Sequence, residues 1–346
     1  MSDAAQRRAP LLEVRLHGLS PLGPIANAAV VAIVIYGLYL LIATLTGQPI
    51  LETGADGRAR IDELTWIAFV LSLVMAAAVT MPALTERQWR VSLNEVIATL
   101  DAQGSDLALE MTKGRLRSQS RGAAVALIFG AAGGVAFNGW MMADGGLTPV
   151  EYLGSTGLWF AVIAPPLFGL GARASLLLRS DDKDMVALVT DHICVTPARF
   201  EELQVYGRLA LRSALIWLVM AAIIGLFFVF SSSFSVSIAA LALSLLASAY
   251  AFTSTIRPVV RITSLKRREA LDAVRTQIEA EAKAALTASG APGRLSDLTA
   301  YEAWLERRPV WPVSAPVTRR LAVYGLIPIL AWFGAAAAQL LVGVVA

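Results

Sequence analysis

The stretch SFSVSIAALALSLLASAYAFTST, residues 233–255, decides the class of fold. It is uncharged, and it is long enough to cross a hydrocarbon core of roughly 30 Å as a helix. In a membrane, helices associate through close backbone packing and hydroxyl bonds, because lipid tails are already apolar. The stretch therefore predicts a transmembrane helix with a small-residue packing face, formed by Ser233, Ser237, Ala240, Ser244, Ser248, Ala251 and Thr255.

The composition extends this prediction to the whole chain. Of its 346 residues, 56% are hydrophobic and only 16% are charged, and the mean hydropathy is +0.63. Such values lie outside the range of soluble domains and predict a polytopic membrane protein. The single cysteine, Cys194, excludes an internal disulfide, and together with His17 and His192 it cannot complete a Cys/His metal site. No cofactor and no metal are predicted.

Apolar runs and their boundaries predict an all-α fold of seven transmembrane helices, arranged as three hairpins and a C-terminal span over a helical cytosolic layer. No strand is predicted. Residues 1–23 contain no apolar core, so we expect a cytosolic leader rather than a signal peptide. The expected organisation is then 24–82 (hairpin 1), 83–121 (cytosolic amphipathic helix), 122–178 (hairpin 2), 179–212 (cytosolic helical segment), 213–256 (hairpin 3), 257–320 (basic cytosolic helical segment) and 321–346 (C-terminal span).

Several local signals place these boundaries. Pro82 is expected to end the second span, and Thr85 with Gln88 three residues later is typical of a capping box at the start of the amphipathic helix. Gly130 and Gly134 form a GxxxG pattern, which favours a close helix contact. Lys and Arg concentrate in 83–121, 179–212 and 256–320. The positive-inside rule therefore predicts a cytosolic N-terminus and a periplasmic C-terminus.

The small-residue face admits two interpretations. In the first, Ser233, Ser237, Ala240, Ser244 and Ser248 pack against a neighbouring helix of the same chain or of another copy. In the second, the serines line a water-filled path through the membrane. A similar choice applies to the basic cluster that follows, which is either an ordinary positive-inside anchor or a site for anionic lipid headgroups. That cluster consists of Arg257, Arg261, Lys266, Arg267 and Arg268.

One polar segment is a candidate enzyme site. It contains Asp181, Asp182, Asp184, Asp191, His192 and Cys194. A base and a thiol in one segment could support cytosolic-face catalysis, but neither residue has a partner at a recognisable motif spacing. The favoured interpretation is a capped helix whose His192 and Cys194 belong to a small cytosolic core.

The C-terminal tail adds an indication of origin. It contains Trp311, Pro312, Arg320, Leu321, Tyr324, Pro328, Trp332 and Ala336. This pattern resembles the ending of several uncharacterised bacterial multi-spanning proteins, and the resemblance covers about the last tenth of the chain. It implies a bacterial inner membrane and no particular activity.

Together these observations favour a non-enzymatic, oligomerising membrane protein that acts as a complex scaffold or as a passive channel. A membrane enzyme is the alternative. A small-solute carrier comes third, because the predicted spans contain almost no ionisable side chains with which to couple transport. Membrane lipids and either a second copy or a complex partner are the expected partners, and nucleic acid is not.

Overall fold

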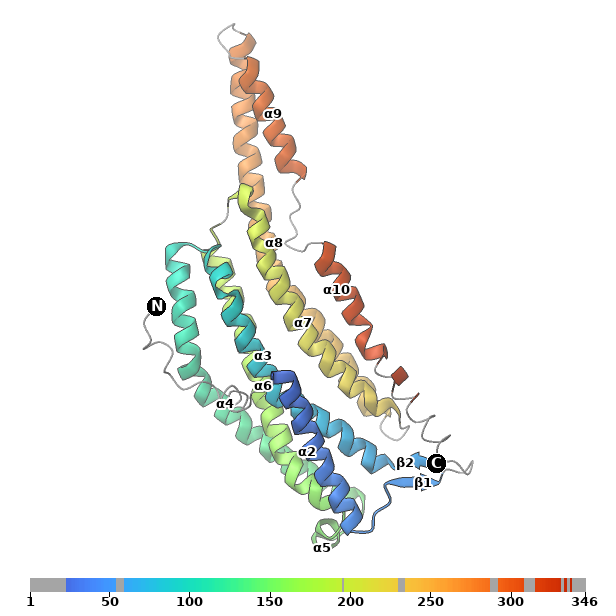
Figure 1. Ribbon diagram of the computed structural model, residues 1–346. Coiled ribbons are helices and arrows are strands. Elements are labelled where there is room, and N and C mark those ends of the chain that lie inside the picture. Colours follow the sequence, from blue (N-terminus) through green and yellow to red (C-terminus); the bar gives the residue numbers. More distant parts are fainter. Residues whose placement is uncertain are drawn as a thin grey trace.

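The computed structural model describes residues 23–53, 59–194, 196–229, 234–286, 292–307 and 315–330, together with 333, 334 and 337. The helices, shown in Figure 1, are α2 (Pro24–Leu45), α3 (Glu63–Ile97), α4 (Ala102–Asp144), α5 (Pro149–Leu153), α6 (Gly157–His192), α7 (Gln204–Gly225), α8 (Phe234–Leu286), α9 (Pro292–Arg307) and α10 (Ala315–Gly325), with 3₁₀ turns η2 (Pro197–Leu203) and η3 (Leu226–Val229). The structure is 89% helical, which confirms the all-α prediction.

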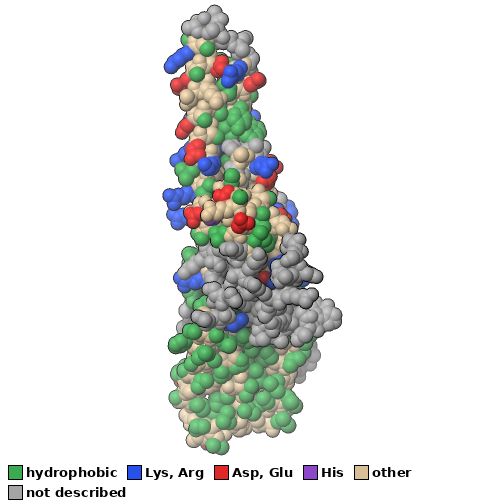
Figure 2. Space-filling model, turned by 90° about the vertical axis from the view of Figure 1, so that its left-hand side faces the viewer, with side chains coloured by type: hydrophobic (Ala, Val, Ile, Leu, Met, Phe, Trp, Pro, Cys, Tyr) green, Lys and Arg blue, Asp and Glu red, His purple; other side chains and the backbone are tan. Residues whose placement is uncertain are grey.

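Five helical segments of the described chain are long and apolar enough to cross a membrane. They are Pro24–Leu45, Glu63–Ile97, Gly122–Asp144, Gly157–Leu177 and Arg199–Gly225, and they match the first five expected spans. The sixth and seventh expected spans include residues or side chains outside the described part of the chain. On the face shown in Figure 2, apolar side chains cover the lower part and charged side chains gather on the upper part.

The expectation of no strands is wrong at one place. Strands β1 (Leu51–Thr53) and β2 (Ala59–Ile61) form a short antiparallel hairpin between α2 and α3, with Leu51 opposite Ile61. The hairpin is held at its base, where the Asp62 backbone N–H donates to the Ile50 carbonyl at 3.1 Å. The Asp62 carboxylate also caps α3 by accepting from the Thr65 N–H at 3.0 Å. Strands this short leave no periodic signal in the sequence.

The expected helix boundary at Pro82 is also wrong. Helix α3 continues through Pro82 to Ile97, so the span and the amphipathic segment form one helix. Proline removes one backbone donor, here the one that would reach the Ala78 carbonyl. Thr85 does not act as a cap, because its Oγ1 donates to the Met81 carbonyl within the same helix at 3.0 Å. Helices α4, α6 and α8 likewise run through the boundaries expected at 121, 178 and 256.

Two of the three buried cores in the described part of the bundle lie near its ends. At the end near α5, the core joins α2, α3, α5 and α6 through Tyr39, Ala43, Ala68, Tyr152, Trp159, Phe160 and Ile163. Asn138 of α4 lies beside this core, and both ends of its side-chain amide are hydrogen-bonded. Tyr152 Oη donates to Asn138 Oδ1 at 2.7 Å, and Asn138 Nδ2 donates to the Phe160 carbonyl at 3.3 Å. Buried polar side chains in this region are thus used for packing.

The second core lies where the apolar helices meet the charged part of the molecule. Its buried residues are Trp89, Val96, Leu100, Ala108, Leu188, Val189, Phe200, Leu203, Val205, Tyr206 and Val259. They come from α3, α4, α6, η2, α7 and α8, so this core fixes the directions in which all of these helices leave the bundle. Thr99 and Tyr206 share a buried hydrogen bond of 2.8 Å within it.

Beyond this second core, α8 and α9 project together from the rest of the molecule, as Figure 1 shows. We call this pair, residues 266–286 of α8 with α9, the arm. Arg275 of α8 binds Glu302 at 2.6 Å and Glu306 at 2.9 Å on α9, and Arg294 binds Glu281 at 3.1 Å. Glu302 and then Glu306 raise the pKa of the Arg275 guanidinium above its ordinary value, which favours its charged form.

Candidate functional site

A cavity of about 1050 Å³ lies between α6 and α8 where the arm leaves the bundle. Three arginines line it: Arg179 of α6, and Arg257 and Arg261 of α8. Arg257 and Arg261 are four residues apart and therefore share one face of α8. The hydroxyl-bearing side chains of Thr190, Tyr250 and Ser254 complete its polar lining. We call this cavity the arginine pocket.

The electrostatics of the arginine pocket favour an anion. The described lining contains no Asp or Glu, and all three arginines are exposed. Pro258 also lines the pocket, and since proline has no N–H, the Ser254 carbonyl loses its helical donor. Guanidinium groups bind phosphate oxygens through two parallel hydrogen bonds, so a cavity lined by arginines suits a phosphate group.

Arg179 follows the apolar stretch Gly157–Leu177 of α6, which is long and apolar enough to cross a membrane. We therefore expect the arginine pocket to lie near a membrane interface. Basic side chains at this depth attract anionic lipid headgroups with about 1 kcal/mol for each Lys or Arg. The structure therefore places two of the five sequence-predicted headgroup residues, Arg257 and Arg261, in one pocket. It adds Arg179, whose proximity to α8 is a long-range contact that no local sequence pattern encodes.

The other three basic residues have different surroundings. Lys266 forms an ion pair with Glu269 at 3.0 Å within α8. Arg267 donates to the Glu306 carbonyl at the base of the arm. Arg268 is exposed and does not line the pocket.

The small-residue face of α8 packs on α7 where it is described. Ser244 and Ser248 are 5% and 6% exposed, and Ala251 and Thr255 are buried as well. Ser248 Oγ donates to the Ala214 carbonyl of α7 at 3.1 Å. Neither serine lines the arginine pocket. Ser233 lies outside the described residues, as do the side chains of Ser237 and Ala240.

The candidate enzyme residues form a structural junction in the described part of the chain. Cys194 and Asp191 are exposed, whereas His192 lies beside Asp101, with Nδ1 3.4 Å from Oδ1. Asp101 also caps α4 by accepting from the Gly104 N–H at 2.6 Å, and its own N–H donates to the His192 carbonyl at 3.0 Å. The Cys194 N–H donates to the Thr99 carbonyl at 2.9 Å, so this segment joins α6 to the start of α4.

The remaining candidate enzyme residues are three aspartates at the start of the polar segment. The side chains of Asp181, Asp182 and Asp184 fall outside the described ones. Among the side chains that are described, no group of three or more His, Cys, Asp or Glu could hold a metal ion.

If the arginine pocket binds anionic headgroups, as the sequence predicts for Arg257 and Arg261, then neutralising it should weaken the effect of anionic lipid on the protein. In the double variant Arg257→Gln/Arg261→Gln, two charges worth about 1 kcal/mol each at an anionic surface are lost. Phosphatidylglycerol should therefore raise the unfolding temperature of the detergent-solubilised protein much less than it does for the unaltered chain. Phosphatidylcholine should act equally on both.

The matched control is Lys266→Gln/Arg268→Gln, which removes the same charge from α8 outside the pocket. An equal loss of the phosphatidylglycerol effect in both double variants would show that net charge acts, and not the pocket.

Comparison with protein-family models, with curated proteins and with solved structures gave no match to this chain. The inferences that follow therefore rest on the residues and geometry of this chain alone.

Proposed function

We propose that the protein is a non-enzymatic scaffold of a membrane complex, in which a membrane bundle holds the helical arm in a fixed position for a partner or a second copy. The observation that carries the proposal is helix α8. It runs without interruption from Phe234 to Leu286, 53 residues in all, so one helix belongs both to the apolar bundle and to the arm. At 1.5 Å per residue, helix α8 is about 80 Å long.

Two further features support a scaffold. Among the described residues of the arm, Val274 and Leu305 are buried, and three ion pairs join α8 to α9. The surface of the arm is available, with Tyr301 42% exposed and stacked on Trp304 at 5.6 Å. Aromatic side chains on a charged surface are frequent anchors of protein interfaces.

The alternatives receive less support from the same residues. A passive channel needs polar side chains along a water-filled path, but Ser244 and Ser248 are buried against α7. A cytosolic-face enzyme needs a nucleophile and a base that meet, but no contact joins the exposed Cys194 to His192 in the described structure, and His192 lies against the capping residue Asp101.

The finer topology belongs to the same proposal. We infer seven spans in three hairpins plus a C-terminal span, with the N-terminus and the arm in the cytosol of a bacterial cell and the C-terminus in the periplasm. The charge distribution supports this orientation, because the basic residues of α8 lie on the side of the arm.

Excising the arm tests the proposal. Arg267 contacts the Glu306 carbonyl, so residues 268–305 can be replaced by a short Gly/Ser linker without stretching the chain. In gently solubilised membranes the unaltered protein should run in an assembly larger than one chain, and the armless variant should not. The purified bundle should keep its unfolding temperature and show no solute flux in liposomes. An unchanged assembly size, or flux that requires Ser244 and Ser248, would refute a scaffold built on the arm.

Loosening the arm should be detectable before it is removed. Arg275→Gln breaks both ion pairs to α9, and each pair stabilises the arm only weakly because these side chains are solvent-exposed. Amide hydrogen exchange in α9 should accelerate by about threefold to tenfold, with exchange in α3 and α7 unchanged. Lys266→Gln is the control, because its ion pair with Glu269 stays within α8. Equal exchange in α9 of both variants would contradict the role of Arg275.

A further inference from the structure

An apolar groove of about 430 Å³ lies between α2, α3 and α7, away from the arginine pocket. Its lining is aliphatic over most of its length and includes Ala28, Ala29 and Ala32 of α2 opposite Ala76 and Ala77 of α3. Alanine faces usually bring helices into contact. Here α2 is buried only toward its other end, at Tyr39 and Ala43, so its first half stands apart from α3 and the space between them remains.

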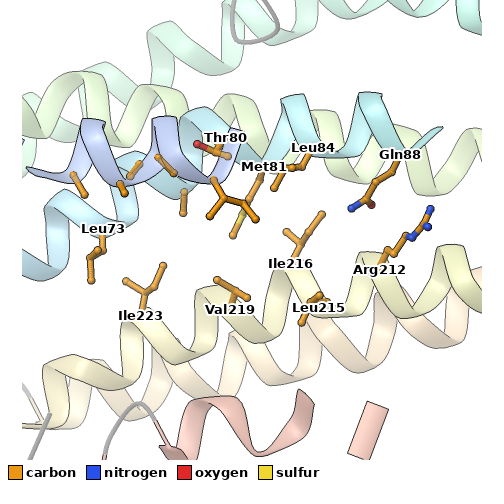
Figure 3. Close-up of a pocket in the computed structure, with 16 residues that line it drawn as sticks. Leu73, Thr80, Met81, Leu84, Gln88, Arg212, Leu215, Ile216, Val219 and Ile223 are labelled. Atoms are coloured by element: carbon orange, nitrogen blue, oxygen red, sulfur yellow. The ribbon is translucent and has the colours of Figure 1, made fainter. Parts of the chain in front are cut away.

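The groove has one polar end. Figure 3 shows Gln88 of α3 and Arg212 of α7 reaching toward each other there, whereas Leu73 and Ile223 lie at the opposite end. Arg212 Nη1 donates to Ser92 Oγ at 3.2 Å. In the described part of the chain Arg212 has no carboxylate partner, and the lining contains no Asp or Glu. A guanidinium at the mouth of an apolar groove favours a ligand that joins an anionic group to an apolar chain.

A second observation points to an occupant inside the groove. Thr80 lines it and is 4% exposed, yet its Oγ1 has no hydrogen-bond partner in the described structure. A threonine in a helix can satisfy its hydroxyl on the preceding turn, as Thr85 does on Met81. An unsatisfied buried hydroxyl costs free energy, so an ester carbonyl of a lipid that accepts from Thr80 would be stabilised there.

The dimensions fit one lipid chain. Along α3 the groove extends from Leu73 to Gln88, 15 positions or about 22 Å. One leaflet of a bilayer contributes about half of a hydrocarbon core of roughly 30 Å. The groove is thus deep enough for an acyl chain, with its ester and phosphate groups toward the polar end.

We propose that this groove binds one anionic phospholipid of the surrounding bilayer, with an acyl chain between α2, α3 and α7 and its phosphate held by Arg212 and Gln88. The N-terminal segment 1–22 is a poorer occupant, because Arg7, Arg8 and Arg15 outnumber Asp3 and Glu13 and would repel Arg212. A second copy would have to present a single thin apolar element with an acidic end to fill the same space.

The test counts bound lipid by native mass spectrometry after exposure to vesicles of phosphatidylglycerol or of phosphatidylcholine. All variants carry Arg257→Gln/Arg261→Gln, so that the arginine pocket does not contribute. The parent should retain one phosphatidylglycerol molecule in preference to phosphatidylcholine. Arg212→Gln should reduce this preference about tenfold, as expected for the loss of one charge-assisted contact. Arg90→Gln, which breaks only the Glu86 pair, should leave it unchanged.

A matched pair of tryptophan substitutions on α2 tests the apolar part of the groove. Ala29 is exposed and lines the groove, whereas its neighbour Val30 is 47% exposed and does not line it. Ala29→Trp should abolish retention of either lipid by filling the space, and Val30→Trp should not. Both substitutions lie on an exposed part of α2, so both variants should fold.

Three outcomes would overturn the proposal. The first is an unchanged lipid preference in Arg212→Gln. The second is lipid that binds only after residues 1–22 are removed, which would make that segment the occupant. The third is a dimer that Ala29→Trp dissociates without any change in bound lipid.

Discussion

Replacing Gly134 with alanine is expected to destabilise the protein by about 3 kcal/mol, although alanine is the better helix former. A Cβ atom at this position would lie 2.5 Å from the Ala164 carbonyl oxygen and 2.6 Å from Pro165 Cα on α6. Both are backbone atoms and cannot rotate away. The two helices must therefore separate, and overpacking of this kind costs about 1–3 kcal/mol or more. Gly130 meets the Phe168 carbonyl in the same way one turn earlier.

The control for this prediction lies next to Gly134. Gly133 is on α4 as well, and a Cβ added there would meet nothing within 4 Å. Gly133→Ala should therefore stabilise the helix by up to about 1 kcal/mol. Thermal unfolding of the detergent-solubilised variants measures both effects. A shift of the unfolding temperature in the same direction for both substitutions would contradict the close contact of α4 with α6 at Gly134.

Replacing Trp159 with alanine should cost about 3 kcal/mol and release α2 from the bundle. Trp159 is 0% exposed, and its Nε1 donates to the Ile35 carbonyl of α2 at 3.0 Å. Its ring also meets Tyr39 edge-on at 5.5 Å between centroids. Burial in a membrane gives little hydrophobic gain, so the cost comes mainly from the cavity and the lost contacts.

Trp140→Ala provides the control for Trp159→Ala, because Trp140 is 59% exposed on α4 and should change stability by less than about 0.5 kcal/mol. Trp159→Phe should give an intermediate value, since it keeps an aromatic ring but loses the N–H donor. Limited proteolysis of the 46–62 connection reports on α2 directly. A Trp159→Ala protein that resists cleavage as well as Trp140→Ala does would exclude this anchoring role.

The sequence could predict the all-α fold and the five helical segments that are long and apolar enough to cross a membrane, because each depends on local apolar length. It could not predict where helices continue. Pro82 and Thr85 look like a stop and a start, but the proline costs one hydrogen bond, and the surrounding core of Trp89 and Val96 outweighs that cost.

The candidate sites, like the fold, could be predicted from the sequence only in part. The four-residue spacing of Arg257 and Arg261 shows from sequence that they share a face of α8. Arg179 joins them only because α6 passes alongside, and Arg212 meets Gln88 only because α7 lies against α3. The β1–β2 hairpin was missed for a different reason, since three-residue strands are too short for a period of two to be recognised.

Because α8 is continuous, a small tilt of its part in the bundle would produce a larger displacement at the tip of the arm. Ser248 of α8 contacts α7 on the bundle side of the arginine pocket, and about 57 Å of helix lies between Ser248 and Leu286. If the helix stays straight and pivots at this contact, a tilt of about 5° displaces the tip by about 5 Å. A pair of spectroscopic labels, one at the tip of the arm and one on α3, would therefore report small rearrangements of the bundle as measurable changes of distance.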